Sequence, residues 1–259
     1  MPDNSLAPDH TSVAISDPGN RRREEHFFID RLVVGVANVV AWIFPLLMIA
    51  IVAQVVMRKM GHNQAWLDDG QWWLYGFAVL TGFAYAITTD SHVRVDIFHQ
   101  NFSATKKAKL EVFAIGWLML PFIGMMVDIL GQYAWSSWVA KEGSDSPNGL
   151  HRLYILKLSL PILMTLAALA SWSMVRRNLA KFTSPTAVKC ILGTLPFCWF
   201  VLDRIVYCVF YWYTRISQPD LATRRIAKEP IMEHTTIIAL ALIVLLLIVF
   251  WVAGRKRRA

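Results

Sequence analysis

The sequence predicts an all-α fold: a polytopic bundle of transmembrane helices with four core spans and one or two further spans near the C-terminus. Hydrophobic residues make up 56% of the 259 residues, whereas a soluble domain is about 45–50% apolar. Several uncharged runs reach about 18 residues, which is the length a helix needs to cross roughly 30 Å of hydrocarbon. We therefore expect an integral membrane protein.

The basic residues flank these apolar runs. The formal net charge is +8, from 26 Lys and Arg against 18 Asp and Glu. Because the positive charges lie at the ends of the runs, they indicate membrane topology and contact with lipid headgroups rather than nucleic-acid binding. Their distribution favours a cytoplasmic N-terminus. We expect residues 1–30 to be a disordered cytoplasmic tail, 31–178 a four-helix membrane domain and 179–259 a C-terminal extension.

The four core spans follow one another closely. Leu32–Met57 is uncharged and contains Pro45. The second span starts at Trp66 and ends at Thr89. A long third helix is expected over Ala104–Val139, with Ser103 as its N-cap and a kink at Pro121. The fourth span is Leu158–Val175, closed by two arginines.

The last eighty residues allow two interpretations. Ala187–Thr214 is apolar and aromatic but has Asp203-Arg204 at its middle. It is either a fifth span with a buried charged pair or two shorter pieces at the membrane surface. Thr235–Ala253 is a clear final span. Counting Lys and Arg does not decide between five and six spans.

Asp128 and the Asp203-Arg204 pair are the only ionisable groups deep in apolar sequence. An intramembrane charge is costly, so each should face protein or water rather than lipid. We favour structural pairing over a functional role. Because Asp128 and Arg204 have similar expected depth, we predict an ion pair between them.

The usual chemistry of membrane enzymes is missing from the sequence. A haem-binding bundle needs histidines inside its helices, but the seven histidines fall in tails, loops or helix edges. There is no Gly-x-Ser-Gly pattern for a nucleophile and no Gly-rich phosphate loop. We predict that the protein is not an enzyme and has no cofactor and no catalytic or metal site.

Two polar segments are candidates for recognition. The second span ends in Asp90-Ser91-His92-Val93-Arg94-Val95-Asp96, in which His92, Arg94 and Asp96 alternate with valines. Such a segment is either a solvated loop or a docking element. Asp68 and Asp69 at the start of the second span have two interpretations as well, favourable helix-dipole placement or partner contact. The same two interpretations apply to Glu142, Ser144 and Asp145 in the loop after the third helix.

Together these segments resemble a known family. Trp66–Phe98, with Trp-Trp-Leu-Tyr-Gly-Phe and His92-Val93-Arg94-Val95-Asp96, resembles the small membrane (DctQ-like) subunit of tripartite ATP-independent periplasmic (TRAP) transporters. The loop Glu142–Leu150, followed by Arg152, Lys157 and Pro161, is similar to the branch labelled mannitol/chloroaromatic-type. The resemblance covers about residues 32–177.

The resemblance implies a function and partners. It implies a non-catalytic scaffold subunit in the bacterial inner membrane, packed against a large transport subunit and served by a periplasmic solute-binding protein. Uptake of an organic acid or similar solute would be driven by an ion gradient. Candidate interface or recognition residues are His92, Arg94, Asp96, Glu142, Ser144 and Lys157.

The C-terminal extension departs from the family pattern of about four helices. It is interpreted as added scaffold, as a second contact with the large subunit or as a contact between complexes. An alternative function for the whole chain is a self-sufficient small channel or an uncharacterised membrane enzyme. That alternative requires Asp128 to line water.

Overall fold

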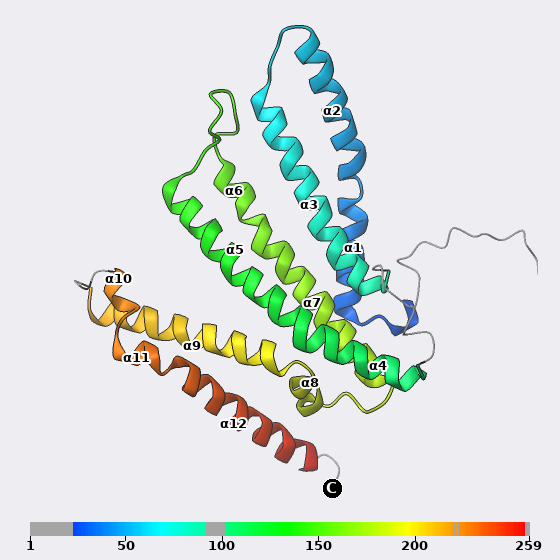
Figure 1. Cartoon of the computed structure of the whole chain (residues 1–259), viewed down its shortest axis with the longest axis vertical. Coiled ribbons are helices and arrows are strands. Elements are labelled where there is room, and N and C mark those ends of the chain that lie inside the picture. The colour runs from blue at the N-terminus through cyan, green and yellow to red at the C-terminus, as the bar shows by residue number, and fades with distance from the viewer. Residues whose placement is uncertain (1–22, 92–101, 220, 222, 257–259) are drawn as a thin grey trace, which may run out of the picture.

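A computed structural model of the chain describes residues 23–91, 102–219, 221 and 223–256. The regular elements in these ranges are all helical, which confirms the predicted all-α class (Figure 1). A short 3₁₀ turn at Arg23–Glu25 precedes the first helix. The α-helices are α1 (Phe28–Val40), α2 (Ile43–Lys59), α3 (Ala65–Thr89), α4 (Ala104–Phe113), α5 (Leu120–Ala140), α6 (Leu153–Lys157), α7 (Ser159–Ala180), α8 (Ala187–Gly193), α9 (Leu195–Ser217), α10 (Thr223–Ile226), α11 (Pro230–Glu233) and α12 (Thr235–Lys256).

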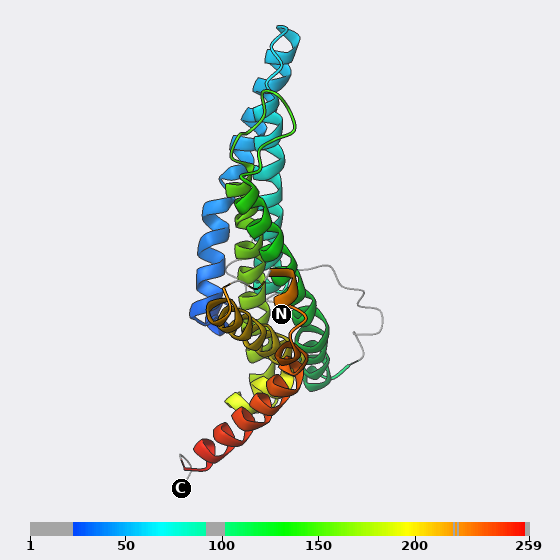
Figure 2. The same cartoon turned by 90° about the vertical axis from the view of Figure 1, so that its left-hand side faces the viewer.

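The helices form an elongated bundle with a hairpin beside it. The bundle contains α1 to α7, whereas α9 and α12 pack on each other next to α5, away from α1, α2 and α3 (Figure 1). In the perpendicular view the bundle is long and narrow, and α12 leaves one of its ends obliquely (Figure 2). The hairpin lies within residues 179–259, the segment expected to be a C-terminal extension.

Helix α7 is the centre of the bundle, with α3 on one side and α5 on the other. Its buried positions include several small residues, among them Ala167, Ala170, Ser171 and Ser173. Small side chains let neighbouring membrane helices approach closely. The apolar core around α7 is completed by residues from α1, α3 and the long third helix: Val33, Ala84, Ile87, Val112, Ile115, Leu120 and Ile123.

The first span is interrupted between α1 and α2. Ala41 and Trp42 form a turn, and Trp42 N donates to Val39 O at 3.2 Å. Pro45 lies four residues after Ala41. Its ring has no N–H and clashes with the carbonyl four residues earlier, which breaks a regular helix at this point.

The third helix is also irregular. Ser103 caps it as predicted, since its Oγ accepts from Lys106 N at 3.3 Å. A π-helical turn at Ala114–Met119 joins α4 to α5 just before Pro121. A π-turn widens the helix and relieves the same proline clash.

Among the described residues, five helical segments are long and apolar enough to cross a membrane. They are Phe28–Lys59, Ala104–Ala140, Leu153–Ala180, Leu195–Ser217 and Thr235–Arg255. Both C-terminal helices qualify by length and composition. Helix α3, the predicted second span, is not among the five, because Gly, Thr, Trp and Tyr lower its apolar character. Its 25 residues still reach about 37 Å at 1.5 Å per residue.

Two glycines fit the hairpin against the third helix. A Cβ on Gly116, within the π-turn, would collide with the carbonyl oxygen of Gly193. A Cβ on Gly124 would lie 3.0 Å from Cε2 of Phe197. Trp117 Nε1 also donates to Leu192 O at 3.3 Å. The C-terminal extension therefore packs closely against the bundle of α1 to α7.

Candidate functional site

The loop between α5 and α6 is fastened to the start of α3. Leu150 N donates to Asp69 Oδ2 at 3.0 Å, and Trp66 N donates to Asn148 O at 3.0 Å. Gly149 is required at this junction, since a Cβ there would collide with Ser144 and lie 2.7 Å from Asp69 Oδ2. Asp69 therefore has a structural partner within the chain.

Glu142 and Lys157 form an ion pair at the same junction. Lys157 Nζ donates to Glu142 Oε1 at 2.6 Å, and Nζ lies 4.3 Å from the ring centroid of Tyr133. Lys157 is buried, whereas Glu142 remains partly exposed. The hydrogen bond from Lys157 lowers the pKa of the Glu142 carboxyl below its ordinary value. The pair holds the loop against the start of α6.

Ser144 completes this junction. Its backbone N donates to Leu150 O at 2.9 Å, and its Oγ accepts from Ser146 N at 3.3 Å. Three of the predicted recognition residues, Glu142, Ser144 and Lys157, are thus brought into one small region. Their contact with another subunit stays a prediction. His92, Arg94 and Asp96 lie outside the described residues.

Asp30 and Arg177 form a buried ionic contact between α1 and α7. Arg177 Nε lies 3.9 Å from Asp30 Oδ2, and both side chains are almost fully buried. Ser173 Oγ donates to the same carboxylate oxygen at 2.7 Å, and Phe27 N donates to it at 2.9 Å. Arg177 Nη2 also donates to Thr88 O at 2.6 Å, which adds the end of α3 to this network.

The sequence does not predict this network. In the sequence Arg177 is a charge at a membrane edge and Asp30 is the last residue of the expected tail, although α1 already begins at Phe28. One signal was present: Ser173 and Arg177 are four residues apart and therefore share a face of α7. Nothing local indicates that this face meets Asp30.

A second polar network joins α2 to α3. Gln54 Nε2 donates to Asp68 Oδ1, and Gln71 Nε2 donates to Gln54 Oε1 at 2.6 Å. Arg58 Nη2 lies 3.3 Å from Asp68 Oδ2. Asp68, like its neighbour Asp69, therefore has partners within the chain.

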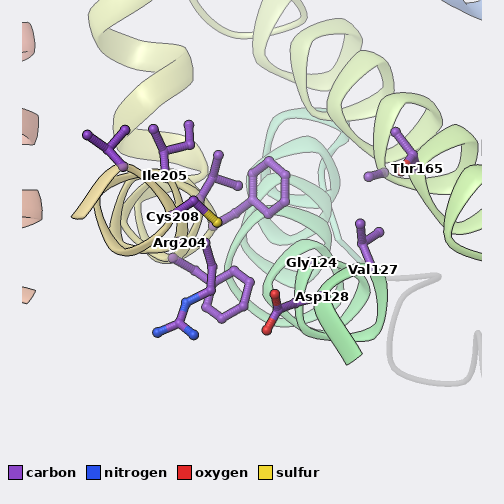
Figure 3. A pocket seen from close by; sticks show the side chains of 12 residues that line it. Gly124, Val127, Asp128, Thr165, Arg204, Ile205 and Cys208 are labelled. Carbon is purple, nitrogen blue, oxygen red and sulfur yellow. The ribbon is translucent and has the colours of Figure 1, made fainter. Parts of the chain in front are cut away.

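An apolar pocket of about 450 Å³ lies between α5, α7 and α9. Asp128 and Arg204 both line it, and their charged ends lie on the same side of it (Figure 3). Arg204 Nη2 pairs with its neighbour Asp203 at 2.7 Å, and Gln132 Nε2 donates to Asp128 at 3.0 Å. Thr236 Oγ1 donates to Asp203 Oδ1 at 3.1 Å, which ties α12 to α9. The predicted Asp128–Arg204 ion pair stays a hypothesis.

Within the described part of the chain, no group of three or more His, Cys, Asp or Glu side chains is arranged to hold a metal ion. The polar groups described above contact one another and hold helices and loops together.

Comparison with known proteins decides the family. A family profile described as "Tripartite ATP-independent periplasmic transporters, DctQ component" matches residues 47–181, just over half of the chain. The chain belongs to the DctQ family. The match spans α2 through α7 and ends where the extension begins. No curated protein and no solved structure matches the chain. The DctQ match therefore includes the Glu142–Lys157 junction and Arg177 but not Asp30 or the hairpin.

Proposed function

We propose that this protein is the small, non-catalytic scaffold subunit of an ion-gradient-driven TRAP transporter. It packs against a larger membrane subunit that carries an organic acid or a similar solute, delivered by a periplasmic solute-binding protein. The observation that carries the proposal is membership of the DctQ family.

The packing of the bundle supports a scaffold role. Its centre is filled by buried apolar side chains such as Ile87, Leu120, Ile123 and Val175. The buried charges of Asp30 and Arg177 contact each other and join α1 to α7. A solute path needs polar groups that face a cavity, whereas the groups at this centre are engaged with one another.

We place this multi-pass membrane protein in the bacterial inner membrane with its N-terminus in the cytoplasm. Arg21, Arg22, Arg23 and Arg31 lie at or before the start of the first span, and positive charge accumulates on the cytoplasmic side of membrane proteins. The Glu142–Lys157 junction then lies at the periplasmic end, where a solute-binding protein could be received.

Co-purification tests the proposal. The tagged full chain is co-expressed with a large TRAP membrane subunit from the same genome and purified in mild detergent. We expect the two proteins to elute together in a fixed ratio, whereas a tagged, unrelated membrane protein of similar size should elute without that partner. Elution of this chain alone under conditions that keep the partner soluble would contradict the scaffold role.

A further inference from the structure

An apolar groove of about 650 Å³ runs between the α2–α3 hairpin and α6. Trp66, Trp73 and Phe77 line it from α3, Ala50 from α2 and Ile155 from α6. It shares no lining residue with the pocket that Asp128 and Arg204 line, and neither Asp30 nor Arg177 belongs to its lining.

The groove has the length of one membrane leaflet. From Trp66 to Phe77, α3 rises about 16 Å at 1.5 Å per residue. Half of a hydrocarbon core of roughly 30 Å is about 15 Å. Trp66 lies in the first turn of α3, and tryptophan favours the headgroup level of a bilayer. The groove therefore extends from that level towards the middle of the membrane.

The outer end of the groove has a positively charged side chain. Arg152 lines it, is exposed, and directly precedes the apolar segment Leu153–Ala180. Three carboxylates at this end of the bundle have other partners: Asp69 binds Leu150, Asp68 binds Arg58, and Glu142 binds Lys157. Among the described residues, Arg152 has no ion pair.

We propose that this groove binds a glycerophospholipid, with its phosphate on the Arg152 guanidinium and one acyl chain along α3 between Trp66 and Phe77. A guanidinium fits a phosphate through two parallel hydrogen bonds. The apolar walls supply the favourable burial of the chain. A diacylglycerol has the same acyl chains but no phosphate. Comparing it with a phospholipid therefore distinguishes the phosphate contact at Arg152 from the acyl-chain contact in the groove.

Arg152→Gln tests the headgroup contact. Purified full-length protein is stripped of lipid in detergent and titrated with dioleoyl phosphatidylglycerol or dioleoylglycerol, and bound lipid is counted by native mass spectrometry. Loss of a charge-assisted contact should weaken phosphatidylglycerol binding about tenfold and leave dioleoylglycerol binding unchanged. Lys59→Gln is the matched control, since it removes an exposed cation from the end of α2 without touching the groove.

Gly70→Leu tests the acyl-chain contact. Gly70 lines the groove, and a Cβ there meets nothing within 4 Å, so leucine fills the groove without a clash at Cβ. Gly76→Leu is the control, because Gly76 is also open but is not part of the groove lining. We expect Gly70→Leu to lose both lipids and Gly76→Leu to keep both, with similar lipid-free unfolding temperatures.

Two results would overturn the proposal. The first is binding of phosphatidylglycerol to Arg152→Gln and Gly70→Leu as tightly as to the unchanged protein. The second is a Gly70→Leu variant that keeps its lipid but no longer co-purifies with the large subunit, because the groove would then hold a protein helix. Since the lipid titration uses this chain alone, its result is independent of whether a partner is found.

Discussion

Single charged residues in this protein are used to fasten helices to one another. Arg177 connects α7 to Asp30 of α1 and to Thr88 O of α3, and Lys157 connects α6 to the loop at Glu142. A buried charge is stable only with such partners, because its hydration has been lost. At this scale, the charged groups act as ties between helices.

The Asp30–Arg177 contact should therefore be sensitive to loss of one partner. Asp30→Leu leaves Arg177 without its carboxylate and should lower the free energy of unfolding by about 3–5 kcal/mol, measured by denaturant titration in detergent. The double variant Asp30→Leu/Arg177→Met should recover part of that loss, since no lone charge stays buried. Additive effects of the two substitutions would contradict the pairing.

Glu142 gives a pH-dependent prediction. Its pKa is lowered in the folded protein by the hydrogen bond from Lys157. Its contribution to stability is thus full above the ordinary carboxyl pKa, about 4.3, and is lost as pH falls through the lower folded value. Glu142→Gln should lower the thermal unfolding temperature at pH 7, and the difference from the unchanged protein should shrink below about pH 4.

The exposed neighbour Asp145 provides the control for this measurement. Asp145→Asn removes the same charge from the same loop and should leave the unfolding temperature close to that of the unchanged protein. If both variants behave alike at neutral pH, the Glu142–Lys157 pair does not stabilise the junction.

Local signals at the scale of helices were readable from the sequence, and contacts between helices were not. Apolar run lengths predicted the helices, and Ser103 was identified as a cap because its signal is contained in three residues. The break at Ala41 was not predicted, although its signal, Pro45, is equally local. The partner of Arg177 depends on how α1 packs on α7, and the neighbours of Gly116 depend on where α8 folds back. No local pattern encodes either contact.

The docking of the C-terminal hairpin depends on Gly116. Gly116→Ala places a methyl group on the Gly193 carbonyl, and such overpacking costs about 1–3 kcal/mol. Spin labels at the exposed positions Phe122 and Leu240, in a chain whose native cysteines are replaced by alanine, report the distance between α5 and α12. We expect the distance distribution to broaden in Gly116→Ala.

Gly131→Ala is the matched control for the hairpin, because Gly131 lies on α5 and has nothing within 4 Å of an added Cβ. The distance distribution between the two spin labels in Gly131→Ala should equal that of the protein without a glycine substitution. An equally narrow distribution for Gly116→Ala would show that the hairpin does not dock on the π-turn.

At the scale of the whole molecule, a DctQ bundle carries an added pair of apolar helices. The family match ends at residue 181, and α9 and α12 lie beyond it. The bundle centre is packed with apolar and small side chains, and Asp30 contacts Ser173 and Arg177 between α1 and α7. This arrangement fits a support whose activity depends on a larger partner.

The most direct test of the scaffold role is solute uptake into vesicles. The chain alone and the chain with the large subunit are reconstituted separately, and uptake of radiolabelled organic acids is measured with the solute-binding protein present and an ion gradient imposed. We predict saturable, gradient-dependent uptake by the complex and background uptake by the chain alone. Saturable uptake by the chain alone would contradict the account.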